Sequence, residues 1–542
     1  MAEAPRAGDR RTAGPPGSIP LFVGLACLAV TLGLYHRALG LHFVGDDIGF
    51  VRPDPHWLRN AFLPAGEWHY YPLTQATFAL LGRWSDWQPA PLHLLNLALH
   101  SAVGLGLALW LSRFGIPAWA RVVAALFFIS RGIHYEVVLW ITELSYLGIA
   151  LYTLLTLACW DRFLRGHGRP FLIGAVLGFA AAVLTIEHAL ILSLLYLLYD
   201  FIMGPRGVPF DPASRWSRLR PRALMRDAIK YVPFLLVALA FLAVKRSFHL
   251  GLTWSSVASA VPALPTFVPS GMDLNARLPD ERIWLGFLNT PGRAYQDLLS
   301  ATSYLFFPSG LAHGADDNWL TRHPWLCLLP WLGIQLWIAW KGRPLARFLL
   351  AWIYVYELPL AIAGVPQARY HYMASIPASA LLGLGVIAAS VRLARWRWKR
   401  ISAATAAVLF GAMILGEARF IRARLQEWTV ASDMVRSSVA ELRRGLAADT
   451  EDLYLLNLPS GVPSPYWPAY AFANAAAHLP LMLRPPRWDV RTHVVYDRSL
   501  VAGRWPTIGR YAPRDTIVRE AGGPTVMAYE FVDHPPWITR LR

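Results

Sequence analysis

The stretch that decides the fold is IPLFVGLACLAVTLGLYHRALGLHF, residues 19–43, which is followed closely by Gly45-Asp46-Asp47. The apolar run is long enough to cross a bilayer, which takes about 20 helical residues. Two adjacent carboxylates at its end cost desolvation energy and repel one another. We therefore expect Asp46 and Asp47 to take part in chemistry at a membrane surface. The alternative is a charge pair that only reaches into the lipid headgroups.

The composition indicates a membrane protein over most of its length. Of the 542 residues, 55% are hydrophobic and 16% are charged, and the mean hydropathy is +0.36. The apolar residues come in blocks that, at about 20 residues per span, predict about eleven transmembrane helices in a mainly α, polytopic protein. The predicted spans are 19–41, 93–112, 117–131, 141–161, 171–186, 188–203, 231–249, 324–340, 347–364, 373–391 and 402–418.

The basic residues predict the orientation of these spans. Lys and Arg are concentrated in alternate loops, at 162–169, 215–230, 341–347 and 392–400. Because positive side chains favour the cytoplasmic side, we expect these loops and the N-terminal tail, residues 1–18, in the cytoplasm. The net charge of +17 is explained by these basic loops, which set the orientation of the spans. Nucleic acid is therefore not expected as a partner. The long loops 42–92 and 250–323 then lie outside.

Residues 420–542 have a different character from the transmembrane region at 19–419. A charged helical stretch is followed by short β-type runs that Pro and Gly interrupt. With an odd number of spans, this part lies outside the membrane, and it predicts a small extracytoplasmic α/β domain. The segments concerned are a helix at Arg422–Leu446, β-type runs at Leu453–Leu458, His493–Tyr496 and Val526–Phe531, and a helical patch at Ala471–Leu483.

Two further acidic positions fall on the same predicted outer side. Glu136 follows His134 by two residues in the loop between the third and fourth spans, where both could bind a hydroxyl, a metal or a sugar, or merely cap the loop. Glu187 ends an apolar segment, and its burial calls for a basic partner. For Glu187, a structural ion pair and a role in a site both remain open.

Three cations lie at the outer ends of spans, against the general charge bias. Lys245 and Arg246 end the seventh span, and Arg369 follows the ninth. Cations in such places call for an anion, and the planar fork of Arg suits phosphate oxygens. We expect a lipid-linked phosphate there, with ordinary headgroup binding as the alternative.

Polar and aromatic residues of the outer segments predict a substrate groove. His93, Asn96 and His100 share one helix face, where polar packing between helices is favoured over metal binding, because no carboxylate lies near them. The aromatic residues could equally form an interfacial belt. The groove residues predicted are His69, Tyr70, Tyr71, His93, Asn96, Tyr370 and Tyr372. Together, the acidic and cationic positions describe a site that receives a phosphate-bearing lipid and an acceptor hydroxyl.

The order of these motifs resembles that of the GT-C glycosyltransferases, integral membrane enzymes marked by an Asp-Asp or Asp-Glu pair in the first outside loop. Within that class the chain is similar to bacterial relatives of protein O-mannosyltransferases, of the transmembrane and TPR-containing type. The resemblance covers about residues 20–435 and includes the helix with Trp428. It rests on Gly45-Asp46-Asp47, Tyr71-Pro72-Leu73-Thr74, the stretch 91–100, His134-Tyr135-Glu136, Glu187 and Arg369-Tyr370-His371-Tyr372.

The resemblance implies an inverting transfer of a sugar, such as a mannose-like hexose, on the outer face of a bacterial-type inner membrane. The donor would be a polyprenyl-phosphate sugar, and the acceptor a hydroxyl of a protein, glycan or lipid. Asp46 would be the general base, with Asp47 beside it and Glu136 in the second acidic motif. Arg369 and Lys245 or Arg246 would stabilise the leaving phosphate.

Some features depart from the pattern of those relatives. Tyr71 stands where they usually have Arg, Thr142-Glu143 replaces a Gly-Arg pair, and no TPR array is present. No nucleotide-binding motif occurs, no metal site is predicted, and a divalent cation is possible but not indicated. A transporter or flippase of lipid-linked saccharides is the main competing function. It would require charged or broken helices at mid-membrane and inverted repeats, whereas the polar residues here gather at one rim.

Overall fold

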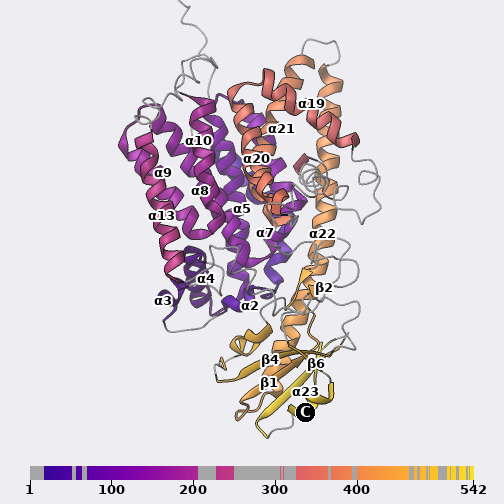
Figure 1. Ribbon diagram of the computed structural model, residues 1–542. Coiled ribbons are helices and arrows are strands. Elements are labelled where there is room, and N and C mark those ends of the chain that lie inside the picture. Colours follow the sequence, from indigo (N-terminus) through magenta and orange to yellow (C-terminus); the bar gives the residue numbers. More distant parts are fainter. Residues whose placement is uncertain are drawn as a thin grey trace, which may run out of the picture.

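A helix lies over each of the eleven predicted spans in the computed structural model (Figure 1). These helices are α1 (Ser18–Tyr35), α5 (Pro89–Ser112), α6 (Ala118–Ser130), α8 (Leu144–Leu164), α9 (Arg169–Thr185), α10 (Leu192–Met203), α13 (Val232–Ser247), α19 (Trp325–Lys341), α20 (Pro344–Ala363), α21 (Tyr372–Leu393) and α22 (Lys399–Gly445). The structure describes residues 18–51, 56–63, 70–204, 228–248, 305–306, 309, 325–363, 368–393 and 399–459, and parts of 461–541.

Several of these helices are long and apolar enough to cross a bilayer. In the described part of the chain there are four, Pro20–Gly40, Pro89–Ser112, Ile141–Leu164 and Ala368–Arg392. The pair Ala118–Ser130 and Gly132–Leu139, bent by 53°, makes a fifth if it is one span. The chain is therefore a multi-pass membrane protein, and the predicted fold class, mainly α with a small C-terminal sheet, is confirmed.

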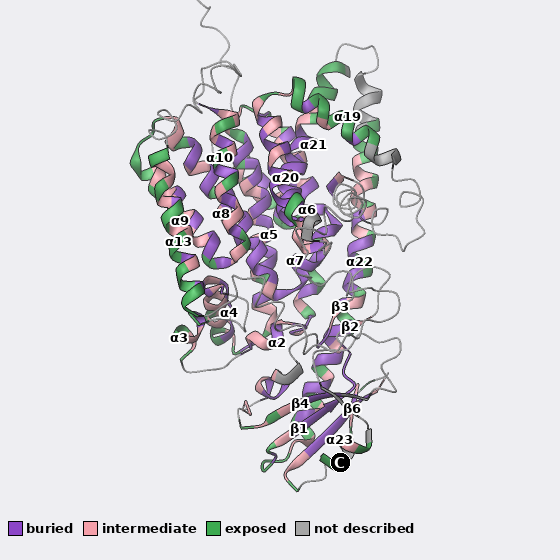
Figure 2. Ribbon diagram, viewed as in Figure 1, coloured by how far each residue is buried: buried purple, intermediate pink, exposed green. Residues whose placement is uncertain are grey.

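The outer faces of the bundle are apolar, whereas its interior is packed with aromatic side chains. Trp110, Trp160 and Trp352 are buried. Large apolar side chains on α1, α9, α13 and α19 are instead exposed, and Figure 2 shows the outward faces of α9, α13 and α19 in green. Exposed apolar faces of this extent suit contact with lipid chains.

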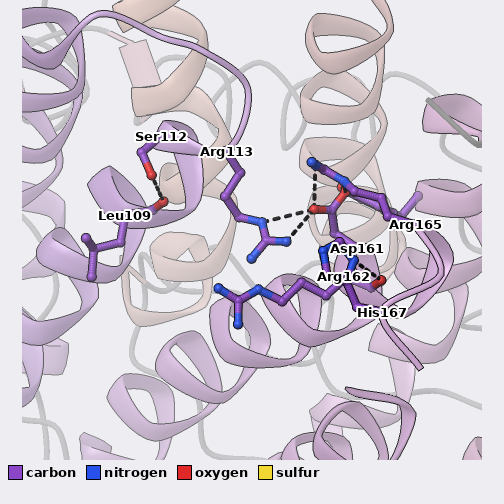
Figure 3. A network of polar contacts seen from close by, with 8 residues as sticks. Leu109, Ser112, Arg113, Asp161, Arg162, Arg165 and His167 are labelled. Carbon is purple, nitrogen blue, oxygen red and sulfur yellow. Dashed lines mark hydrogen bonds and ion pairs between the residues drawn. The ribbon is translucent and has the colours of Figure 1, made fainter. Parts of the chain in front are cut away.

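The end of the bundle farther from the C-terminal sheet is held by an aspartate near the end of α8. The Asp161 carboxylate accepts hydrogen bonds from Arg113, which directly follows α5, at 2.7 and 2.9 Å, and from Arg165, at 3.0 Å (Figure 3). The hydroxyl of Tyr199 in α10 donates a further bond of 2.7 Å. Three helices are thus tied together at this end, which we call the basic end.

Short elements at the other end, which we call the sheet end, carry the motifs that the sequence singled out. These short elements lie between successive long helices of the chain (Figure 1). These elements are η1 (His36–Gly40), α2 (Asp47–Phe50), α3 (Trp57–Ala61), α4 (Pro72–Trp84), η2 (Gly132–His134), α7 (Tyr135–Leu139), η3 (Ile141–Glu143), η4 (Glu187–Ile191) and η7 (Ala368–His371); η5 (Ile229–Tyr231) precedes α13.

Helix α22 joins the bundle to the C-terminal sheet. It runs for 47 residues, about 70 Å, straight across the boundary predicted at 419/420. The sheet beyond it has the order β5-β4-β1-β6-β7 and is parallel except for β7. Its elements are β1 (Asp452–Leu456), β4 (Arg491–Asp497), β5 (Arg510–Ala512), α23 (Arg514–Glu520), β6 (Val526–Phe531) and β7 (Ile538–Arg540), with η8 (Ala476–Met482) beside them.

A two-stranded ribbon returns from this sheet toward the bundle. It consists of β2 (Gly461–Val462) and β3 (Ala469–Tyr470), which pair antiparallel. Residues of this ribbon share one buried apolar cluster with the loop at 41–51 and with α22. The C-terminal domain is therefore packed directly onto the sheet end of the bundle.

Candidate functional site

The loop Val44–Asp47 connects η1 to α2 at the sheet end. Gly45 has φ +55°, a left-handed conformation that glycine adopts at little cost. A Cβ atom at this position would lie 3.0 Å from Trp140 Cζ2 and 3.0 Å from Tyr470 Cβ. The Gly45 N–H donates a 2.6 Å hydrogen bond to the carbonyl of Ala471. Glycine is thus required here because two aromatic side chains close on the backbone.

The two carboxylates after Gly45 have different surroundings. Asp47 is fully buried, and its oxygens accept hydrogen bonds from the backbone N–H groups of Thr142, at 2.8 Å, and Val44, at 3.3 Å. Burial raises the pKa of Asp47 to about 8, although these donors oppose the shift and the charge of Asp46 adds to it. Asp46, at the start of α2, is half-buried. Asp47 therefore fastens the loop to η3, and Asp46 is the more accessible of the pair.

Glu136 and Arg369, from separate motifs, meet at the sheet end. The Glu136 carboxylate is buried and accepts a 3.0 Å hydrogen bond from the backbone N–H of Arg369. The Arg369 side chain forms an ion pair with Glu143, with 3.4 Å between Nε and Oε1. One carboxylate thus holds the backbone of Arg369, and a second carboxylate pairs with its guanidinium.

Trp140 links this charged cluster to the loop of Asp46. Its indole N–H donates to the Val44 carbonyl at 3.2 Å, and its own carbonyl accepts from Asn96 Nδ2 at 2.9 Å. The guanidinium of Arg369 lies 5.1 Å from the Trp140 ring centroid. The indole also stacks on Tyr470 at 4.6 Å, with 25° between the ring planes, and lies 5.9 Å from the Trp428 ring. The aspartate loop and the Glu136–Arg369 cluster are therefore neighbours.

Glu187 and Lys245 form an ion pair of 3.0 Å, so the basic partner that the burial of Glu187 called for is Lys245. His188, next in the chain, accepts or donates a 3.0 Å hydrogen bond with Tyr146 and lies 6.0 Å from the Tyr370 ring. Tyr370 in turn lies beneath the Arg369 guanidinium, 5.1 Å away. Aromatic rings thus connect this ion pair to Arg369. Arg246 is exposed.

Two of the aromatic residues predicted for the groove, Tyr70 and Tyr71, pack against other aromatic side chains. Tyr70 packs against Phe241 and Phe248 of the α13 end, and Tyr71 stacks on Phe50 at 5.8 Å. His69 lies outside the described residues. Tyr70 and Tyr71 therefore lie at the sheet end, between α2 and α13.

Several of the polar residues singled out in the sequence are buried in the bundle interior. His134 Nε2 is 2.7 Å from Ser375 Oγ, and its ring packs on Tyr372 at 4.6 Å. The Tyr372 hydroxyl is 2.8 Å from His100 Nδ1, and His93 is also fully buried in α5. The bonds of His100 to Tyr372 and of Asn96 to the Trp140 carbonyl join separate elements of the bundle through polar groups.

Four residues near the cluster were not among the predicted site residues. Glu143 was noted only as a departure from a family pattern, and Trp140 and Tyr470 carry no motif. Glu357 of α20 is buried and lies 2.9 Å from His371 Nδ1. A buried acid inside an apolar span is a signal for function that could have pointed to Glu357. Among the described residues, no group of three or more His, Cys, Asp or Glu side chains could hold a metal ion.

Comparisons with known proteins give a partial sequence match and distant structural matches. No family model matches the chain. A curated relative, Protein O-mannosyl-transferase tmtc2 of Xenopus laevis, is 33% identical over 156 residues, which is 26% of this chain and 18% of that protein. The chain thus aligns with less than a fifth of the relative's length. The predicted resemblance to O-mannosyltransferase-like proteins is confirmed by this relative.

Solved structures match the chain at low sequence identity and with TM-scores below 0.5. The archaeal oligosaccharyltransferase AglB from Archaeoglobus fulgidus, in complex with an inhibitory peptide and a dolichol-phosphate, matches with a TM-score of 0.44 at 15% identity, over 81% of this chain and 62% of that one. ArnT from Cupriavidus metallidurans matches with a TM-score of 0.36 at 14% identity, over 95% and 92%.

Proposed function

We propose that this protein is a GT-C-type membrane glycosyltransferase that moves a sugar from a polyprenyl-phosphate donor to an acceptor hydroxyl. The observation that carries the proposal is the meeting of the Asp46 loop with the Glu136–Arg369–Glu143 cluster around Trp140. The site would then offer a carboxylate for a hydroxyl proton next to a guanidinium for a phosphate. The tmtc2 relative supports this class of activity.

In the proposed reaction, Asp46 takes up the proton of the acceptor and Arg369 faces the leaving phosphate. The acceptor hydroxyl gives its proton to the Asp46 carboxylate as its oxygen attacks the anomeric carbon of the donor sugar. The bond from that carbon to the phosphate oxygen breaks, and the electron pair leaves with the polyprenyl phosphate. Attack opposite to the leaving group inverts the anomeric carbon. Arg369 stabilises the charge that develops on the phosphate.

The remaining predicted residues have supporting roles in this proposal. Asp47 holds the catalytic loop through Thr142 and Val44. Glu136 orients the backbone at Arg369, and Lys245 and Arg246 border the phosphate side, with Glu187 as the partner of Lys245. Tyr70, Tyr71 and Tyr370 would line the groove for the sugar and its lipid. The acceptor would be a protein, glycan or lipid hydroxyl.

We further propose that the sheet end faces the outside of a bacterial-type inner membrane. Arg113 and Arg165 lie at the basic end, and Lys341 and Arg343 lie in the turn between α19 and α20. Cationic side chains in such positions favour the cytoplasmic side. The N-terminal tail would then be cytoplasmic, and the C-terminal domain extracytoplasmic.

Replacement of the proposed base tests this function. Asp46→Asn removes the proton acceptor but keeps its shape, so we expect transfer to fall by about 10²–10⁴-fold. The assay is transfer of radiolabelled sugar from a synthetic polyprenyl-phosphate sugar to acceptors in membranes. Asp433→Asn, on the exposed side of α22, is the matched control and should keep wild-type activity.

Two outcomes would reject the proposal. Full transfer by Asp46→Asn would remove the assigned base. Wild-type protein that moves lipid-linked saccharide across vesicles, and never transfers the sugar, would favour the transporter or flippase instead. Comparison of glycoproteins and glycolipids by mass spectrometry, from cells with and without the gene, identifies the acceptor.

A further inference from the structure

The C-terminal domain reaches into the candidate site through Tyr470 of β3. The Tyr470 ring stacks on Trp140 with 4.6 Å between ring centroids. Trp140 belongs to the bundle, between α7 and η3, so this stack joins two parts of the chain that are more than three hundred residues apart.

The same ribbon also holds the backbone of the aspartate loop. The Ala471 carbonyl accepts the 2.6 Å hydrogen bond from the Gly45 N–H. Gly45 lies against both residues, because a Cβ there would be 3.0 Å from Trp140 Cζ2 and 3.0 Å from Tyr470 Cβ. Tyr470 and Ala471 thus restrain the residue that precedes Asp46 by both packing and hydrogen bonding.

Charged groups of the candidate site act on the hydroxyl of Tyr470. Burial raises the pKa of the Tyr470 hydroxyl; Arg369 opposes this rise, whereas Glu136 and Asp46 add to it. Tyr470 and Arg369 also share a neighbour, because both contact the Trp140 ring.

We propose that Tyr470 is a positioning residue that sets the location of Asp46, so that the C-terminal domain completes the transferase site. This inference rests on the proposed function. The consequence is that the domain is required for the chemical step itself, in addition to any contact with the acceptor. A displaced general base loses rate steeply, since an error of about 1 Å can cost 10²-fold.

The inference is tested in the full-length protein with two variants of Tyr470, Tyr470→Ala and Tyr470→Phe, and with one control variant. Tyr454 is the control, because it forms a similar stack with His493, at 4.6 Å and 22°, but within the sheet. We expect Tyr470→Ala to lower kcat on the order of 10²-fold with little change in the donor KM. Tyr470→Phe keeps the ring and should retain most of the activity. Tyr454→Ala should keep the wild-type kcat.

Hydrogen–deuterium exchange supplies a second measurement that does not depend on activity. In Tyr470→Ala, the amide of Gly45 should exchange faster, seen in a peptide covering residues 43–51, while Tyr470→Phe and Tyr454→Ala exchange as the wild type does. The inference would be overturned if Tyr470→Ala had the kcat of the wild type and the same exchange rate at Gly45. It would also be overturned if Tyr454→Ala lost as much kcat as Tyr470→Ala does. If the wild type transfers no sugar, the proposed function fails, and the exchange data alone decide whether Tyr470 holds the loop.

Discussion

Asp46 and Asp47 are adjacent in the chain, yet only one of them is buried. The Asp47 carboxylate accepts two backbone hydrogen bonds, whereas Asp46 is half-buried at the start of α2. Sequence reasoning favoured Asp46 as the base through a family resemblance. The surroundings supply a physical reason, because a carboxylate that already accepts two backbone bonds is less able to accept a substrate proton.

The pH dependence of stability tests the surroundings of Asp47. Its ordinary pKa of 3.8 is raised to about 8, so between these values the native protein keeps a proton that the unfolded chain has lost. This contribution to stability is therefore complete below about pH 4 and is lost as the pH rises through about 8. We expect the melting temperature of the wild type, relative to that of Asp47→Asn, to fall between pH 4 and 8. A difference that is flat or rises with pH would contradict the burial of an acid here.

The element that most affects the site is α22, because it contacts both the bundle and the C-terminal domain. The sequence suggested a span and then a separate charged helix, but no helix-breaking residue separates them, and the helix is continuous. Within it, Glu417 is fully buried and forms an ion pair with Arg131, just before η2. Glu417 also accepts a 2.8 Å hydrogen bond from the Gly132 N–H. This pair fixes the segment that leads to Glu136.

Removal of one partner of this pair should be costly. Glu417→Leu leaves the Arg131 guanidinium buried without its carboxylate, which we expect to cost about 3–5 kcal/mol of unfolding free energy. The double variant Arg131→Met with Glu417→Leu removes both charges and should recover a large part of that loss. Thermal unfolding in detergent measures both. Equal stability of the single and double variants would show that the charge is not what matters.

At the scale of the whole molecule, the two ends of the bundle have different roles. The sheet end brings together loops, short helices and the β2–β3 ribbon around the site (Figure 1). The basic end is a set of helix ends that Asp161 ties together (Figure 3). Because α5 is 24 residues long, about 36 Å of helix separates these ends.

A substitution at the basic end should therefore affect stability and leave the chemical step intact. Asp161→Asn weakens the bonds to Arg113, Arg165 and Tyr199, with an expected loss of about 1–3 kcal/mol. The kcat of the folded fraction, assayed well below the melting temperature, should equal that of the wild type. A fall in kcat without a loss of thermal stability would show coupling between the two ends.

The sequence by itself determined where the helices of the bundle and three of the five strands of the C-terminal sheet lie. Hydropathy, charge and alternation are local properties, so every predicted span lies on a helix, and β1, β4 and β6 lie where β-type runs were expected. The order of the motifs also indicated which residues to examine, from Asp46 to Arg369.

Only the tertiary structure decided which of these residues are partners. Three contacts join positions that are far apart in the chain: Lys245 with Glu187, Arg369 with Glu143, and Tyr470 with Trp140. No local pattern encodes such pairings, since each depends on how distant helices pack and on which buried charge must be neutralised. For the same reason the sequence did not reveal the stack of Tyr470 on Trp140, which joins the C-terminal domain to the bundle.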